Sequence, residues 1–149
     1  MLDDVNLRIL RELSLDPRLG MSALARRVGM SPPAVTERVQ RLTDDGVIGF
    51  RLEVDPAALG LPVAAYVRVR PTAGQLSRVA ELAQRLPEVS ECHRITGEDC
   101  FLLKVHAASI GALEETLDRF LLFGQTVSSL VVSTPVEPRP LVPEAVGPD

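Results

Sequence analysis

Aromatic residues are scarce in this sequence: they make up 3% of the chain, and tryptophan is absent. We therefore expect neither a base-stacking surface for single strands nor an aromatic-lined cofactor pocket. Cysteine is equally scarce, because Cys92 and Cys100 are too few for a disulfide framework. With His93 and His106 they also lack the paired close spacing of a structural zinc site. We therefore expect no metal, no cofactor and no disulfide between the two cysteines.

Long apolar runs are also missing. No uninterrupted apolar stretch approaches the roughly 18 to 20 residues that a membrane span needs. Residues 1–4 include two aspartates, whereas an export signal would begin with basic and then apolar residues. We therefore expect no membrane segment and a cytoplasmic protein. The 149 residues allow one ordinary domain or two small ones, and an apolar content of 46% allows a packed core.

One segment carries a local excess of positive charge in a chain whose formal net charge is −4. Residues 18–41 hold five arginines against a single glutamate, and the chain beyond residue 55 is acidic overall. A basic segment in an otherwise acidic chain is typical of a local face that binds nucleic acid. We expect the second half of the chain to make no contact with nucleic acid.

Three short helical patterns occupy the first 55 residues. Asp3 is expected to cap the first helix, in which apolar residues recur every fourth position. Ser22 is expected to cap a second helix that stops at Gly29, and Ser31 is expected to cap a third helix with proline at its first position. Because about three residues separate the second and third helices, the spacing predicts a helix-turn-helix.

The third helix is predicted to have one buried and one exposed face. Val35, Val39 and Leu42 form an apolar stripe that would pack on the first helix, so the opposite face could enter the major groove of DNA. The residues expected to contact DNA are Arg26, Arg27, Ser31, Pro33, Thr36, Arg38, Gln40 and Arg41.

Different members of this set suit different parts of DNA. Gln40 and Arg41 can hydrogen-bond base edges, and Thr36 can contact a thymine methyl group or a phosphate. The backbone amides of residues 31–34 suit a phosphate, and the other three arginines would clamp phosphates beside the helix. A phosphate would repel Glu37, so we expect Glu37 to pair with Arg41 one turn later. The alternative is a solvated charged helix in a protein-interaction module.

Residues 47–54 alternate weakly, and this pattern predicts a small hairpin, or wing. The periodicity changes after this segment. The elements then come in the order strand, helix, strand, strand, helix, strand, with the two middle strands joined around Gly97. The strands are expected from residue 63 to the break at residue 71, and over residues 89–96, 100–107 and 126–134. This βαββαβ order predicts a ferredoxin-like domain with four antiparallel strands in one layer and two helices in the other.

The fold class is therefore α+β: an N-terminal winged helix-turn-helix followed by a C-terminal ferredoxin-like βαββαβ domain. We assign residues 1–55 to the DNA-binding domain, 56–62 to a hinge, 63–134 to the βαββαβ domain and 135–149 to a tail. The tail has five prolines and no periodicity, so we expect it to be disordered or extended.

Both faces of the predicted sheet carry apolar side chains, although its helices can cover only one. Leu102 lies beside Leu103 in sequence, and Val131 lies between Leu130 and Val132. A second copy of the chain, packed through the same face, is the commonest way to cover such a surface. The alternative is that these are a few ordinary exposed aliphatic residues.

Five groups of residues stand out together. They are Leu2-Asp3 with Ile9-Leu10, Leu24-Ala25 before Val28-Gly29-Met30-Ser31, Arg38-Val39 with Arg41-Leu42, Asp45-Gly46-Val47-Ile48, and Asp55-Pro56 with Leu59-Gly60. In these groups the sequence resembles the Lrp/AsnC (feast/famine) transcriptional regulators over nearly its whole length. The resemblance implies a winged helix-turn-helix reader and a βαββαβ (RAM) domain that dimerises through its sheet and commonly assembles into tetramers or octamers.

The resemblance also implies an amino acid or a similar small effector, bound where RAM domains of neighbouring dimers meet. In many members the hairpin turn reads Gly-acidic-x-Asp-aromatic, and here Cys100 stands at the aspartate position. We expect Asp99 to supply the carboxylate for the effector's ammonium group, with glycine amides and two hydroxyls holding its carboxylate. The expected effector residues are Gly97, Glu98, Asp99, Thr126 and Ser128. Alternatively, these are ordinary turn and strand residues.

These observations predict a sequence-specific transcription regulator whose assembly and DNA affinity respond to an amino acid or similar small effector. Paired readers would bind half-sites about one helical turn, roughly 34 Å, apart, and binding would weaken steeply with salt. One alternative is an enzyme that is similar to sirohaem decarboxylases, which resemble this family in both domains; there His93 or His106 would assist. The other is a stand-alone amino-acid sensor or interaction module.

Overall fold

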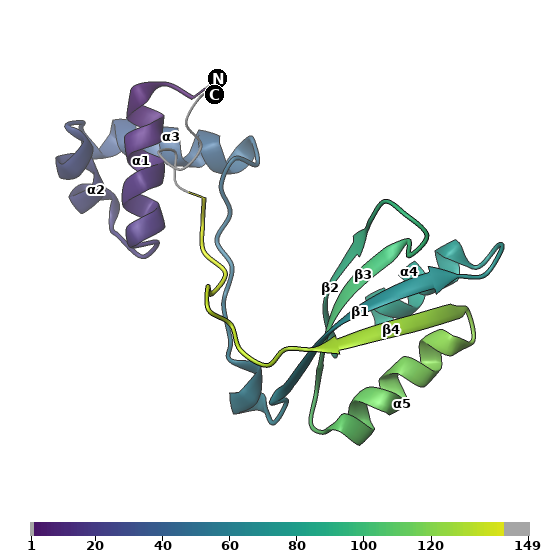
Figure 1. Ribbon diagram of the computed structural model, residues 1–149. Coiled ribbons are helices and arrows are strands. Elements are labelled where there is room, and N and C mark those ends of the chain that lie inside the picture. Colours follow the sequence, from purple (N-terminus) through teal and green to yellow (C-terminus); the bar gives the residue numbers. More distant parts are fainter. Residues whose placement is uncertain (1, 142–149) are drawn as a thin grey trace. The chain divides into compact units, whose positions relative to one another are not determined.

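A computed structural model of the chain describes residues 2–141 (Figure 1). It contains two compact units, one built on Met1–Leu52 and the other on Glu53–Pro135. Within the segment expected to be a hinge, Pro56–Leu59 forms a short 3₁₀ helix, η1, whose first turn is capped by Asp55. In the expected tail, residues 135–141 carry neither helix nor strand, and residues 142–149 lie outside the described part of the chain.

Three helices, α1 (Asp4–Leu15), α2 (Met21–Val28) and α3 (Pro32–Asp44), form the N-terminal unit. Asp3 caps α1 as predicted, since its carboxylate accepts a hydrogen bond of 2.7 Å from the Asn6 amide. The prediction that Ser22 caps α2 was wrong. Gly20 holds the cap position and Met21 is already helical, so Ser22 lies within the first turn. Gly29 ends α2 in a left-handed conformation (φ 72°), which glycine adopts without strain.

The core of this unit draws on all three helices. Ile9 and Leu13 of α1 and Leu24 and Val28 of α2 are buried against the α3 residues. The predicted apolar stripe of α3 is confirmed, because Val35, Val39 and Leu42 are all buried in this cluster. The burial fixes which side of α3 faces the solvent.

The hairpin predicted over residues 47–54 is absent, since this segment contains no strand. Val47, Phe50, Leu52 and Val54 are exposed. The segment has no Asn-Gly or Asp-Gly pair to form a tight turn, and an isolated two-stranded hairpin is marginally stable in water. The helix-turn-helix is therefore followed by an irregular connection.

The C-terminal unit is the predicted βαββαβ domain. Its elements are β1 (Val63–Pro71), α4 (Leu76–Arg85), β2 (Val89–Arg94), β3 (Phe101–Ala107), α5 (Ile110–Leu121) and β4 (Gly124–Leu130). The strands are antiparallel in the order β2-β3-β1-β4, and α4 and α5 pack on the same face of the sheet (Figure 1). Alternate residues of the central strands, including Val67, Val69, Leu103 and Val105, are buried beneath the helices.

The last strand lies earlier in the sequence than residues 126–134. Gly124 already pairs with Pro71, and the ladder ends where Leu130 pairs with Ala65 and Val131 donates to the Ala64 carbonyl. Beyond this point β1 offers few further partners, because it begins at residue 63. The strand prediction therefore failed at both ends, since the extent of β4 is set by its neighbour in the sheet.

Candidate DNA-binding surface and effector site

The outer face of α3 is a shallow, open depression. It is lined by Pro32, Pro33, Thr36, Glu37, Gln40, Arg41 and Asp44. This face is solvent-exposed because the stripe of Val35, Val39 and Leu42 points into the core. The structure thus brings the predicted base-reading residues together on one exposed helical surface of a size that fits the major groove.

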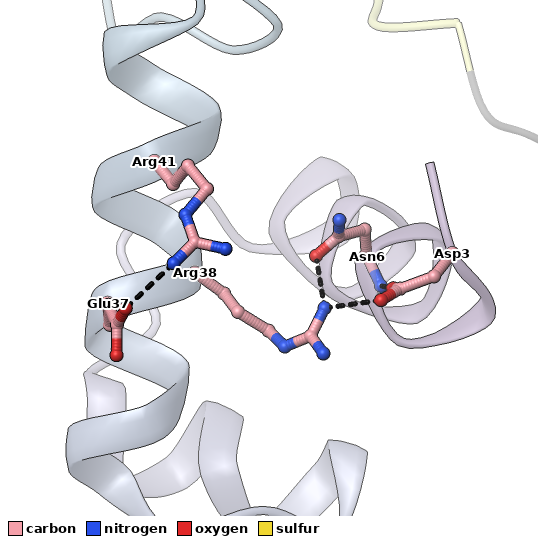
Figure 2. A network of polar contacts seen from close by, with 5 residues as sticks. All are labelled: Asp3, Asn6, Glu37, Arg38 and Arg41. Carbon is pink, nitrogen blue, oxygen red and sulfur yellow. Dashed lines mark hydrogen bonds and ion pairs between the residues drawn. The ribbon is translucent and has the colours of Figure 1, made fainter. Parts of the chain in front are cut away.

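Each polar side chain of this face already has a local partner. The Thr36 hydroxyl donates to the Pro32 carbonyl, and the Gln40 amide donates to Asp44, both at 2.8 Å. Arg41 donates to the Glu37 carboxylate at 2.7 Å, which is the predicted pairing (Figure 2). The last pair is largely exposed on both sides, and such pairs contribute little net free energy in water. DNA could therefore replace these partners at small cost.

Arg38, which we expect from the sequence to clamp a phosphate beside this face, is engaged with the start of α1 in this structure. Figure 2 shows its guanidinium extended toward the start of α1. Its Nη1 donates to Asp3 at 2.6 Å and to the Asn6 side-chain oxygen at 3.0 Å. The reason is tertiary, because Arg38 lies at the border between the buried and exposed faces of α3, within reach of α1.

The other two flanking arginines differ from each other. Arg27 donates to Glu12 of α1 at 2.8 Å, whereas Arg26 is exposed and has no ion pair among the described residues. The carboxylates of Asp3 and Glu12 thus offset part of the positive charge of residues 18–41. Among the three flanking arginines, a phosphate contact by Arg26 would break no ion pair of the described residues.

The start of α3 offers fewer amides than we expected. Ser31 occupies the cap position, but its hydroxyl makes no capping hydrogen bond. Pro32 and Pro33 form the first turn and have no N–H group. Of residues 31–34, only Ser31 and Ala34 can therefore donate a backbone hydrogen bond to a phosphate.

In the βαββαβ domain, the turn residues expected to bind an effector face two arginines. Arg70 donates to Glu98 at 2.7 Å and to Asp99 at 3.3 Å, and the Nε atom of Arg68 lies 3.9 Å from Asp99. Gly97 adopts φ 103°, which allows the chain to turn at this point. Neither arginine is among the effector residues predicted from the sequence. Their alternation along β1 is visible in the sequence, but the approach of a turn some 28 residues away is not.

The five expected effector residues do not meet within one chain. Arg68 and Arg70 lie on the face of the sheet that the helices leave uncovered, because the alternate residues Val67 and Val69 are buried. Thr126 pairs with Val69 and Ser128 pairs with Val67, so their side chains belong to the helix-covered side. Glu98 and Asp99 contact the arginines of the uncovered side. Residues paired across adjacent strands share a face, and this alternation separates the two groups.

Cys92 and Cys100 are free thiols in this structure, and burial raises the pKa of Cys92. Cys92 pairs with Leu103, whereas the carbonyl of Cys100 accepts from the Ile95 amide.

The two histidines lie on the uncovered face of the sheet. His106 alternates with the buried residues of β3, and His93 pairs with Leu102, which alternates with them in the same way. His93 Nε2 is 3.1 Å from Glu91, and His106 Nε2 is 2.8 Å from the Ser90 hydroxyl. Burial, and then the charge of Lys104, lower the pKa of His106, while Glu91 opposes the shift. Across residues 2–141 there is no group of three or more His, Cys, Asp or Glu side chains arranged to hold a metal, and no helix suited to crossing a membrane.

Both units match known protein families. Residues 2–48 match the winged helix-turn-helix DNA-binding family, and residues 64–141 match the Lrp/AsnC ligand binding domain. The chain belongs to the Lrp/AsnC family of transcriptional regulators. It is 39% identical over 133 residues to the HTH-type transcriptional regulator LrpC of Bacillus subtilis, and the matched region covers 89% of this chain and 92% of LrpC. The solved structure of LrpC superposes with a TM-score of 0.84 at 38% identity, covering 90% of this chain and 96% of LrpC.

Two further solved Lrp/AsnC-like structures were determined with L-methionine. A transcriptional regulator of Neisseria meningitidis is 26% identical, with a TM-score of 0.84 and coverage of 92% of this chain and 94% of that one. A feast or famine regulatory protein of Mycobacterium tuberculosis is 32% identical, with a TM-score of 0.84 and coverage of 96% and 100%. The relatives are named as transcriptional regulators and not as enzymes, so the decarboxylase alternative has no support.

Proposed function

We propose that this Lrp/AsnC protein binds double-stranded DNA in a sequence-specific manner through the outer face of α3. The observation that carries the proposal is the exposed face itself. A helix whose apolar stripe is buried in its own core presents Thr36, Gln40 and Arg41 outward in a shallow surface. Gln40 and Arg41 would read base edges, and Arg26 would contact a phosphate.

The remaining residues of the expected set have smaller roles in this proposal. Ser31 donates its backbone amide to a phosphate, while Pro33 contacts DNA only through its ring. Arg27 reaches a phosphate only by leaving Glu12, from which it is 2.8 Å away. Residues 1–55 are the DNA-binding part, 56–62 join it to the effector and assembly part at 63–134, and 135–149 form a tail. The protein acts in the cytoplasm, where its DNA lies.

Binding to DNA fragments at low ionic strength tests this proposal, with fluorescence anisotropy as the readout. We expect the wild-type protein to prefer some promoter fragments, including the DNA upstream of its own gene, over random DNA. Arg41→Ala should lose this preference. Arg85→Ala is the matched control, since Arg85 is an exposed helical arginine in the other unit. If Arg41→Ala weakened binding to all sequences equally, Arg41 would be a phosphate contact; if no fragment bound, the proposal would fail.

We further propose that the effector is an amino acid, as in the two relatives solved with L-methionine. The turn at Gly97 places the carboxylates of Glu98 and Asp99 beside the Arg70 guanidinium, and a zwitterion needs groups of both signs. Thr126 and Ser128 lie on the opposite side of the sheet, so they could join this site only from another subunit. A thermal-shift screen of the twenty amino acids tests the proposal, because a ligand selective for the native state raises the melting temperature. Asp99→Asn should abolish the response, and Glu115→Gln, on the exposed side of α5, should keep it.

The uncovered face of the sheet is the proposed dimer interface, and dimers assemble further into tetramers or octamers. Tyr66 and Val127 lie exposed on this face, with Lys104 over the Tyr66 ring. An effector bound between dimers changes DNA affinity only through its different affinities for the assembly states, so effector and DNA must influence each other reciprocally. Analytical ultracentrifugation with and without L-methionine tests this. A monomer at all concentrations would rule the interface out.

A further inference from the structure

We propose that Asp3 is a positioning residue for DNA binding, because its carboxylate fixes the recognition helix α3 on α1 through Arg38. The inference rests on the proposed function, in which α3 contacts DNA. Asp3 precedes α1 and does not line the outer face of α3. It lies 35 residues from Arg38 in the sequence.

The two oxygens of the Asp3 carboxylate act on different helices. Oδ1 accepts from the Asn6 backbone amide at 2.7 Å and caps α1, while Oδ2 accepts from Arg38 Nη1 at 2.6 Å. The same Nη1 donates to the Asn6 side-chain oxygen at 3.0 Å (Figure 2). Arg38 therefore contacts the cap residue of α1 and one side chain of its first turn. We call this group of Asp3, Asn6 and Arg38 the α1–α3 latch.

The directional contacts of the α1–α3 latch fix the rotation of α3 about its axis, which the apolar core alone does not. Val35, Val39 and Leu42 hold α3 on the core, but apolar burial is non-directional and tolerates small rotations of a helix about its axis. Charge-assisted hydrogen bonds are directional, so the latch selects one rotation. A rotation of α3 would move the outward side chains of Gln40 and Arg41 relative to the bases, because they project from the helix axis.

The two arginines of α3 differ in how firmly they are held. Arg41 shares one contact with Glu37, and the two side chains are 67% and 72% exposed. Arg38 has two acceptors, and its side chain is 30% exposed. DNA therefore displaces the partner of Arg41, whereas Arg38 stays on α1 and acts through the orientation of the helix.

The latch persists at neutral pH because Asp3 stays ionised. The Asn6 amide, and then the Arg38 guanidinium, hold the pKa of the Asp3 carboxyl below its usual value of 3.8. The shift agrees with the geometry of the two carboxylate oxygens.

The test compares Asp3→Asn with Asp4→Asn in the full-length protein. Asparagine caps helices as well as aspartate does, so Asp3→Asn keeps the cap of α1 through Oδ1. The amide nitrogen that replaces Oδ2 cannot accept a hydrogen bond, so the bond from Arg38 is lost. We expect this variant to weaken DNA binding by about three- to tenfold, in line with the loss of a partly exposed ion pair. Asp4 lies next in the sequence, is exposed and makes no ion pair among the described residues. Asp4→Asn should leave binding unchanged or slightly stronger.

The sign of the effect distinguishes positioning from simple charge repulsion. Removing a negative charge near DNA strengthens binding if the charge acts only through repulsion. Both variants would then bind DNA more tightly, and the inference would be overturned. Weaker binding by Asp3→Asn alone supports it.

The salt dependence of Arg38→Gln supplies a second readout. A lost phosphate contact makes the negative slope of log K against log salt shallower by about 0.9. Loss of a positioning residue changes the affinity and leaves the slope unchanged. A reduced slope would place Arg38 on a phosphate and overturn the inference.

Hydrogen exchange of the full-length protein keeps the inference testable even without DNA. Residues 32–44 should exchange faster in Asp3→Asn than in Asp4→Asn, with residues 63–130 unchanged in both. Equal exchange in the two variants would overturn the inference. If the wild-type protein bound no DNA, the proposed function would fail, while hydrogen exchange would still decide whether Asp3 holds α3.

Discussion

Glu37→Gln should make the protein bind DNA more tightly. The Glu37 carboxylate lies on the outer face of α3, where it holds Arg41 at 2.7 Å and would face phosphates in a complex. Releasing Arg41 from an exposed pair of this kind costs about 0.3–0.5 kcal/mol. A carboxylate about 8 Å from a phosphate in water is repelled by about 0.5 kcal/mol.

Together these contributions approach 1 kcal/mol at low ionic strength, or about a fivefold gain in affinity. At roughly 0.15 M ionic strength screening reduces the repulsion, and we expect about a threefold gain. Fluorescence anisotropy over a salt series measures both values, with Glu115→Gln as the control because it removes the same charge from the other unit. Weaker binding and a loss of sequence preference in Glu37→Gln would contradict this prediction, since the carboxylate would then be accepting a hydrogen bond from a base.

Three further predictions concern stability. Gly124→Ala should destabilise the sheet by about 1–3 kcal/mol, because a Cβ there would overlap a backbone carbonyl of β1. In Gly111→Ala on α5 the new Cβ would make only an ordinary contact of 3.8 Å with the Ser109 hydroxyl, so this variant should stabilise its helix by up to about 1 kcal/mol; chemical denaturation measures both. Leu24→Ala should cost about 2–5 kcal/mol and remove helical circular dichroism and DNA binding, while Leu15→Ala, 75% exposed, should change little. Burial lowers the pKa of His106 below its usual 6.5, so the neutral imidazole contributes its full stability above about pH 6.5 and loses it as the pH falls through the lowered pKa. Below about pH 6.5 the melting temperature of the wild-type protein should therefore fall more steeply with acidity than that of His106→Gln. Equal pH profiles of the two proteins would contradict the lowered pKa of His106.

The architecture was largely predictable because it depends on local patterns. The Asp3 cap, the left-handed Gly29 and the α3 stripe each follow from residues within a few positions of one another. The same holds for the Glu37–Arg41 pair, whose members are one helical turn apart. Local patterns were misleading over residues 47–54, where the predicted hairpin is absent, because weakly alternating residues do not form strands without a partner.

The site residues were less predictable because their partners lie far away in the sequence. Arg38 resembles a phosphate clamp when α3 is considered alone, and only the packing of α3 on α1 reveals Asp3 as its partner. In the same way, the sequence offers Asp99 as a carboxylate for an ammonium group, and only the sheet reveals that Arg70 lies beside it.

Caps, turns and helical periodicity act between near neighbours, so the local sequence specifies the three N-terminal helices, the order of the elements in the βαββαβ domain and the exposed face of α3. The pairing of distant charges, such as Arg38 with Asp3 and Arg70 with Glu98, and the face of the sheet on which Thr126 lies became apparent only from the folded chain. Those outcomes depend on strand register and helix packing, which join residues about 30 positions or more apart. A one-residue change in register would exchange the two faces of a strand without altering its local sequence pattern.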